Sequence, residues 1–449
     1  MLVQYKMDIR FFPLSTLKKR VLPESGSTRI YRIYVGPALF FTVNLASSFV
    51  SYLFQLLASR ALSIVEYGEL VALFSAIGII TLPFAVVNPA IVKKVSEYKV
   101  HQNFASLTKL FSGLVVINLL FSLILLLFFG LFSKQSASWL NIANQHTILL
   151  CSLIAGVSLV SGLPGIFLQG LLRFKGASFL GIIASVAKLF FGIGGIILLS
   201  GVIGAFYGLL FGFILVFIVG CLVLKKNLHL KNIFELDFAP VRSIFSYAVS
   251  SVIIIAPITI ILNLDTILAK HYLVPELAGI YSSVAIIGKI IFFGVSGFGA
   301  IVFPIISEKV TRGESLDKFI AGSLKIYLAL LFCAVAIYRF FPQIIVNLLF
   351  GSRYIDAIPH LGIYAVYISF YSILSLFSTI YLATARFAYG KILLGGLFLY
   401  LGFVVLSTKT INGLIYAGIL SMGLTLVATI VYHYAFVRNS SRLQAGKDN

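Results

Sequence analysis

The chain has 449 residues, of which 60% are hydrophobic and only 11% are charged. Soluble domains contain about 45–50% apolar residues, so this composition excludes a soluble protein and predicts a polytopic membrane protein. The formal net charge of +20 would suit a partner such as nucleic acid, but the positions of the basic residues argue against that partner.

Twelve apolar runs are each long enough for the roughly 20 residues that a membrane-spanning helix needs. They lie at 38–59, 69–92, 107–132, 146–170, 176–200, 203–224, 243–269, 277–305, 322–341, 358–384, 388–407 and 411–436. We therefore expect an all-α membrane protein of about twelve transmembrane helices, with almost no chain left for a soluble domain.

The basic residues gather on one side of these expected spans. The two tails and the even-numbered loops hold 26 of the 34 Lys and Arg residues, whereas the odd-numbered loops and adjoining helix ends hold six. The positive-inside rule then predicts that both termini are cytoplasmic, in a multi-pass protein of the cytoplasmic membrane. The surplus charge is a topology signal, with contact to anionic membrane lipids as a side effect. No nucleic acid is expected as a partner.

One stretch occurs twice. The pattern from Ala58 to Glu97 returns without a gap from Ala269 to Glu308, and Gly68 falls on Gly279 at an offset of 211 (279 − 68). A duplicated half of six spans predicts two six-helix bundles related by a pseudo-twofold axis along the membrane normal, because an even number of spans preserves orientation. The expected parts are a basic cytoplasmic tail (1–36), an N-terminal bundle (37–224), a cytoplasmic linker (225–242), a C-terminal bundle (243–436) and a cytoplasmic tail (437–449).

Polar residues line one face of the first expected helix and one face of the seventh. The first face carries Asn44, Ser48, Ser51, Gln55 and Ser59, and the seventh carries Thr259, Asn263, Thr266 and Lys270. Steps of three and four residues place such side chains on one helix face. Under the repeat offset, the two faces are symmetry mates. They predict a shared aqueous cleft between the halves, and the alternative is that they only join helices by hydrogen bonds.

Prolines inside the expected spans, at positions 83, 89, 164 and 257, are candidate bending points. Gly204, Gly208 and Gly212 recur every four residues and predict a face for close helix packing.

Charged side chains inside a bilayer are costly, at about 2.5–3.5 kcal/mol each on insertion scales, so they mark functional candidates. Lys188 and Lys289 lie mid-span, Asp265 lies in the last turns of the seventh helix, and Arg60 and Lys270 lie at outer helix ends. Since the cations outnumber Asp265, a bound anion would restore neutrality. A structural ion pair between Asp265 and Lys289 is the alternative for that acid.

The sequence shows no catalytic constellation, no metal-ligand spacing and no motif for a cofactor. The three cysteines stand singly in apolar helices, and the six histidines lie at helix ends or in loops. We therefore expect neither an enzyme nor a bound cofactor or metal.

Several segments resemble a known family. SRALSIVEYGELVAL resembles the turn after the first helix of Wzx-type polysaccharide flippases, members of the multidrug/oligosaccharidyl-lipid/polysaccharide exporter superfamily. LDTILAKHYLVPELAGIYSSV, GFGAIVFPIISE, LQGLLRF and LLFGSRYIDAIPHL resemble later segments, in the same order along the chain. The resemblance spans about residues 38–436 and departs at Ser63-Ile64, where Gly-Pro is usual.

The resemblance implies a V-shaped pair of six-helix bundles that opens alternately to the two sides, with a cationic central cavity for a lipid-linked sugar phosphate. It carries over Arg60 and Asp265 as matched positions, whereas Lys188 and Lys289 follow from burial. The leading hypothesis is a flippase for a polyprenyl-pyrophosphate-linked oligosaccharide in surface polysaccharide biosynthesis. We expect Arg60, Lys188, Lys289, Lys270, Asn44, Gln55 and Asn263 to bind substrate, and Asp265 to couple transport to a cation, H⁺ or Na⁺.

Three alternatives remain open. A cation-coupled multidrug exporter of the same superfamily would need core carboxylates, and none is expected in the first six spans. A polysaccharide polymerase or ligase would need a large outer loop, which this chain lacks. A lipid II flippase would usually have two more helices.

Overall fold

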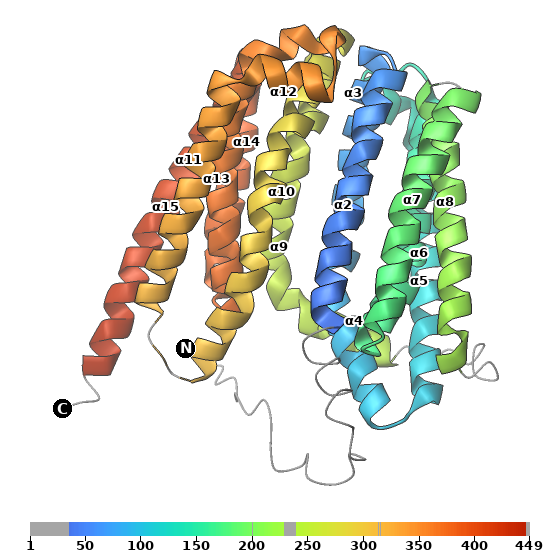
Figure 1. The fold of residues 1–449 in the computed structure, drawn as a ribbon, viewed down its shortest axis with the longest axis vertical. Helices are drawn as coiled ribbons and strands as arrows, with labels where there is room; N and C mark the ends of the chain where they lie inside the picture. The colour runs from blue at the N-terminus through green and yellow to red at the C-terminus, as the bar shows by residue number, and fades with distance from the viewer. Residues whose placement is uncertain (1–35, 200, 229–238, 313, 315, 446–449) are drawn as a thin grey trace.

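The computed structural model describes residues 36–445 except 200, 229–238, 313 and 315. Its described part is built from helices that form two lobes side by side (Figure 1). The ends of the described chain lie at one end of the molecule, which we call the proximal end; the opposite end is the distal end.

The first lobe consists of α2 (Gly36–Ala61), α3 (Ile64–Ile80), α4 (Leu82–Val100), α5 (Phe104–Trp139), α6 (Gln145–Gly170), α7 (Phe174–Leu199) and α8 (Gly201–Leu224), followed by the short helix η3 (Lys225–Asn227). The second lobe consists of α9 (Ala239–Tyr272), α10 (Pro275–Thr311), α11 (Asp317–Phe340), α12 (Pro342–Leu349), η5 (Ser352–Ala357), α13 (Ile358–Ala383), η6 (Phe387–Tyr389), α14 (Gly390–Leu406) and α15 (Ile411–Ala445).

Ten helices in the described residues are long and apolar enough to cross a membrane, and α3 with α4 forms an eleventh span that is bent by 49°. The helix α2, with 26 residues, covers the first of the twelve expected stretches. The bend lies at Thr81, and α4 begins with a proline in its first turn. Pro83 is thus a bending point, as predicted, because proline fits the first turn of a helix but cannot donate a backbone hydrogen bond. The helices α6 and α9 run on through Pro164 and Pro257.

The turn where the sequence departs from the family pattern is closed by a capping box. The Ser63 hydroxyl oxygen accepts from the backbone N–H of Glu66 at 3.2 Å, and the Glu66 carboxylate accepts from the backbone N–H of Ser63 at 2.9 Å. Two otherwise unpaired helix donors are satisfied in this way. Ser63 therefore starts α3 without the usual Gly-Pro.

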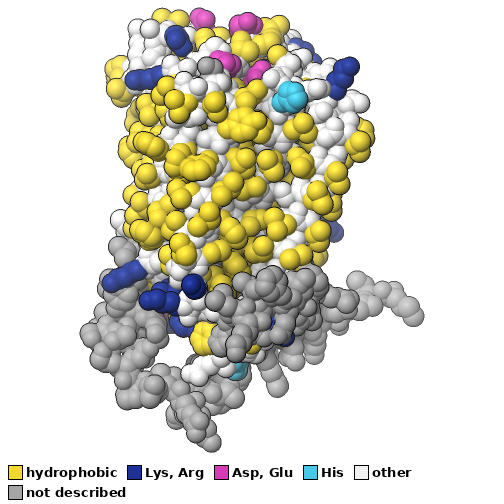
Figure 2. All heavy atoms as spheres, turned by 90° about the vertical axis from the view of Figure 1, so that its right-hand side faces the viewer, with side chains coloured by type: hydrophobic (Ala, Val, Ile, Leu, Met, Phe, Trp, Pro, Cys, Tyr) yellow, Lys and Arg dark blue, Asp and Glu magenta, His cyan; other side chains and the backbone are white. Residues whose placement is uncertain are grey.

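Small residues let α7 and α8 approach closely, as predicted for the Gly204 face. A Cβ added at Gly204 or Gly208 would collide with the backbone oxygen of Gly195 or Phe191 on α7. In a membrane, helices associate through such packing and not through the hydrophobic effect, since lipid tails are themselves apolar. On the face drawn in Figure 2, hydrophobic side chains form a broad band and charged side chains gather at its two ends.

Parts of the predicted tails and linker lie outside the described residues. This applies to residues 1–35, including the basic tail, and to 229–238 of the linker. At the other end, α15 continues beyond the expected boundary at 436 to Ala445. Its last residues contain no Gly or Pro to end a helix before Gly446.

Candidate functional site between the lobes

The two lobes touch at the distal end through a pair of repeat mates. A Cβ added at Gly68 on α3 would lie 2.9 Å from the Cα of Gly279 on α10, so the two helices are in backbone contact there. Residues that are related by a twofold axis touch each other only where the axis passes between them. The contact therefore locates the pseudo-twofold axis at this pair.

Crossed hydrogen bonds between the lobes surround this contact. The Arg60 guanidinium on α2 donates to the carbonyl of Leu348 at 2.8 Å, and the repeat mate of Arg60, His271 on α9, donates through Nδ1 to the carbonyl of Trp139 at 2.6 Å (271 − 60 = 211). In each case the end of a polar-faced helix bonds to the last turn of a helix in the opposite lobe, α12 or α5.

The next pair of mates repeats the arrangement. The Ser59 carbonyl accepts from the Tyr354 hydroxyl, and the Lys270 carbonyl accepts from the Asn141 side-chain amide, each at 3.2 Å (270 − 59 = 211). One apolar cluster also continues from the second lobe into the distal half of the first. The distal end is therefore closed by two equivalent sets of contacts.

The polar face of α9 lies in this closure. Thr266 donates to the Ser75 hydroxyl at 2.8 Å, and the ammonium of Lys270 lies 3.7 Å from the carboxylate of Glu69 on α3. The Asn263 side chain packs against Gly78. These predicted residues do face the other lobe, as the cleft hypothesis required, and in this state they form contacts between the lobes.

Glu69 was not predicted as a site residue, because no core carboxylate was expected in the first six spans. Its side chain is only 14% exposed and is paired with Lys270. Its position three residues after the capping Glu66 made it look like part of a polar turn. Because α3 already starts at Ile64, Glu69 lies inside the helix.

The predicted polar residues on α2 have different surroundings. Gln55 is half-buried and its side-chain oxygen has no hydrogen-bond partner, whereas Asn44 is exposed and its side chain lies near Gly181 of α7. Asn44 therefore lies beside another helix of its own lobe. The hydrogen bonds that join this α2 face to the second lobe come from its distal part, at Ser59 and Arg60.

Lys188 lies in the middle of α7, within the first lobe. Its ammonium lies 5.3 Å from the ring centre of Phe54 and 5.1 Å from that of Phe74. Cation–π contacts of this kind stabilise an ammonium partly, by about 0.5–2 kcal/mol. Among the described residues no carboxylate pairs with Lys188. It is therefore a half-buried cation whose charge is not neutralised by the protein.

Lys289 and Asp265 form a buried ion pair inside the second lobe. The ammonium lies 2.9 Å from one carboxylate oxygen, and the Tyr364 hydroxyl donates to the other oxygen at 2.6 Å. Asp265 is 1% exposed and Lys289 is 6% exposed. The structural ion pair considered from the sequence is thus formed in this state.

The structure does not bring the four predicted cations together. Lys188 lies in the first lobe and Lys289 in the second, while Arg60 and Lys270 belong to the distal contact. Lys289 and Lys270 are paired to carboxylates, whereas the half-buried Lys188 has no carboxylate partner among the described residues and can still attract an anion.

Two six-helix lobes around a pseudo-twofold axis, closed at one end, define the class of this protein as a two-lobe polytopic membrane protein. A family model described as "Polysaccharide biosynthesis protein" matches residues 36–310, more than half of the chain, and the chain belongs to that family. The family confirms the resemblance to polysaccharide flippases. No curated protein sequence matches the chain.

Solved structures of the same fold belong to transporters and flippases. An inward-facing MATE multidrug-resistance transporter of the MOP superfamily superposes with a TM-score of 0.68 at 11% identity, covering 90% of this chain and 99% of that one. The lipid II flippase MurJ in an inward closed conformation gives 0.63 at 16% identity, covering 87% of each chain. A MOP superfamily transporter from Pyrococcus furiosus, whose binding pocket is described as having reverse polarity, gives 0.54 at 14% identity, covering 90% and 95%. At these identities the likeness concerns the fold.

Proposed function

We propose that the protein is a flippase that moves a polyprenyl-pyrophosphate-linked oligosaccharide across the cytoplasmic membrane by alternating access. The observation that carries the proposal is the unneutralised ammonium of Lys188. A buried cation without a carboxylate is costly unless an anion or water compensates it. Lysine is a common phosphate binder, and a pyrophosphate headgroup would supply the missing negative charge while the lipid tail stays in the bilayer.

The other predicted site residues would take part in alternating access in three ways. Arg60 and Lys270 hold the distal end closed in this state, and they would become available to an anion when the lobes separate there. Asp265 would serve as the coupling group for H⁺ or Na⁺, since loss of its charge would release Lys289. Asn44, Gln55 and Asn263 would contact the hydrated part of the substrate.

The alternative of a multidrug exporter needs a carboxylate free to bind a cation. Within the described spans, Asp265 and Glu69 are both paired with lysines. This favours an anionic substrate. The family and the similar folds are those of flippases and transporters, which favours transport over a polymerase or ligase activity.

The first test removes the charge of Lys188. Lys188→Ala should lower glycan export by about 10- to 100-fold, because a hydrogen bond to a charged group contributes about 1.5–3 kcal/mol and each 1.4 kcal/mol is tenfold. Surface glycan and membrane protein level are measured together in cells that make the glycan. Lys188→Arg should retain part of the export.

The matched control is Lys409→Ala. Lys409 also lies over an aromatic ring, 4.1 Å from the centre of Tyr272, but it is exposed at the distal end. This variant should export normally. Normal export by Lys188→Ala at a normal protein level would refute the proposal.

The second test concerns orientation, with both termini expected in the cytoplasm. In a background without native cysteines, Ser138→Cys and Ser352→Cys at the exposed distal end should react with an impermeant maleimide added outside intact cells. Lys175→Cys and Lys318→Cys at the exposed proximal end should react only after the cells are opened. The reverse pattern would invert the proposed topology.

A further inference from the structure

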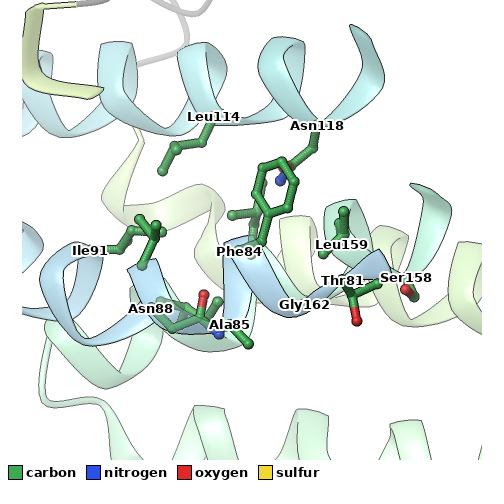
Figure 3. A pocket seen from close by; sticks show the side chains of 13 residues that line it. Thr81, Phe84, Ala85, Asn88, Ile91, Leu114, Asn118, Ser158, Leu159 and Gly162 are labelled. Atoms are coloured by element: carbon green, nitrogen blue, oxygen red, sulfur yellow. The ribbon is translucent and has the colours of Figure 1, made fainter. Parts of the chain in front are cut away.

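The first lobe contains a pocket that the cation sites do not use. It has a volume of about 230 Å³ and lies next to the bend between α3 and α4, where residues of α4, α5 and α6 line it (Figure 3). Ligand pockets for drug-sized molecules measure about 300–1,000 Å³. This pocket is therefore suited to a smaller group.

Asn118 of α5 marks this pocket as a binding site. Its side chain lines the pocket and is only 2% exposed, and its oxygen atom has no hydrogen-bond partner. Buried polar groups are normally paired, because an unpaired one forfeits the hydrogen bonds it would make with water. A ligand that donates a hydrogen bond would satisfy this oxygen.

The hydroxyl groups around the pocket also act as acceptors. Thr81 and Ser158 already donate their hydroxyl protons to helix carbonyls, those of Ile77 and Ala155, each at 2.8 Å. A hydroxyl that has used its proton keeps only acceptor lone pairs. Together with the Asn118 oxygen, the pocket therefore presents several acceptors, and its lining contains no charged residue.

The remaining wall is apolar and aromatic. Phe84 faces the pocket near Asn118, and its ring is held by Phe121, with ring centres 4.9 Å apart (Figure 3). Leu114 and Ile91 add aliphatic surface, and the half-buried Asn88 adds a carboxamide that can both donate and accept. The complementary ligand is uncharged, carries several O–H donors and has an apolar C–H face.

We propose that this pocket binds one sugar ring of the transported glycan. A sugar ring combines hydroxyl donors at its rim with a C–H face that can pack on Phe84. A phosphate group would need a cation to offset its charge, which the lining does not supply, and it would offer no donor to the Asn118 oxygen. A prenyl chain would also leave that oxygen unpaired. The inference rests on the proposed function, because that function names the glycan as the source of the sugar. The sugar would be recognised at Asn118 and Phe84, and the pyrophosphate headgroup at Lys188.

The test uses the full-length protein in nanodiscs of phosphatidylethanolamine and phosphatidylglycerol, free of glycoside detergents. Saturation-transfer NMR is recorded with methyl glycosides of glucose, galactose, rhamnose and N-acetylglucosamine. At least one of them should receive saturation from the wild-type protein. Asn118→Leu keeps the branching and the number of heavy atoms of the side chain but removes the acceptor, and it should reduce that signal at least fivefold.

Two controls separate binding from folding. Asn118→Leu should unfold at the same or a higher temperature than the wild type, since it removes an unpaired buried polar atom. Ser122→Ala, a buried position on the same helix outside the pocket lining, should leave the signal unchanged.

The outcomes distinguish this inference from the proposed function. Lys188→Ala should keep the glycoside signal even though it loses export. If the wild type binds a glycoside at Asn118 but exports no glycan, the sugar site stands and the proposed function fails. The sugar assignment is overturned if no glycoside receives saturation, if Asn118→Leu binds as well as the wild type, or if Asn118→Leu instead loses binding of undecaprenyl monophosphate, which carries no sugar.

Discussion

Replacing Lys289 by Met, or Asp265 by Asn, should destabilise the second lobe by about 3–5 kcal/mol, which is the usual cost of removing one partner of a buried ion pair. The Lys289 ammonium and the Asp265 carboxylate lie 2.9 Å apart, and each change leaves the remaining charged group buried without its partner. Asp265 would keep the Tyr364 hydroxyl as a donor, so Lys289→Met should be the milder of the two. Chemical unfolding of the purified protein measures both.

The double variant Asp265→Asn/Lys289→Met should recover most of the lost stability, because replacing both members of a buried pair is often close to neutral. A surface pair provides the control. Lys309 and Glu314 lie 2.6 Å apart but are 30% and 43% exposed, and Glu314→Gln should leave the unfolding midpoint nearly unchanged, because exposed ion pairs contribute little to stability. An equal loss of stability in Asp265→Asn and Glu314→Gln would show that burial does not increase the contribution of the Asp265–Lys289 pair to stability.

The same double variant separates the two roles considered for Asp265. If the pair is structural, stability and export should return together. If Asp265 couples transport to protons, stability should return while export stays low and loses its dependence on a pH gradient. Export measured in vesicles with and without an imposed gradient distinguishes the two results.

The sequence predicted the fold well because its signals are local or repeated. A run of about 20 apolar residues indicates a membrane span whatever that span packs against. The offset of 211 between Gly68 and Gly279 can be read from the sequence alone. The cost of burying Lys188 in a bilayer likewise follows from its position in an apolar run. These properties need no knowledge of neighbouring helices.

The site was less predictable because it depends on which helices meet. Asp265 and Lys289 are 24 residues apart on different helices, and nothing in the sequence chose their pairing over an anion bound to Lys289. The pairing of Glu69 with Lys270 joins the two halves of the chain. The pocket at Asn118 forms where three helices meet beside the bend at Thr81. The sequence indicated the bend through the nearby prolines, but it did not show which helices meet there.

The repeat offset also could not show where the symmetry axis lies. Every residue in the duplicated stretch has a mate, and the offset is the same for all of them. Only the structure shows that Gly68 meets Gly279, so that two glycines inside α3 and α10 form a backbone contact between the lobes.

That contact makes Gly279→Ala a change that should open the distal end. An added Cβ would collide with the carbonyl oxygen of Ile64 at the start of α3, and it can be relieved only by separating α3 from α10. Overpacking costs about 1–3 kcal/mol. Because the cost applies only to the closed state, the balance should shift about 5- to 150-fold toward distal-open conformations, and export should fall because the cycle must pass through the closed state.

The opening can be followed at Ser75, which is 6% exposed and accepts a hydrogen bond from Thr266 across the lobe interface. In a background without native cysteines, Ser75→Cys in nanodiscs should react slowly with a maleimide, and adding Gly279→Ala should raise the rate by a similar 5- to 150-fold. Gly294→Ala is the matched control, since it lies on the same helix with no atom within 4 Å of the added Cβ, and it should leave the rate unchanged. If Gly279→Ala leaves Ser75→Cys as protected as before, the glycine contact does not hold the distal end closed, and the crossed hydrogen bonds of Arg60 and His271 must suffice on their own.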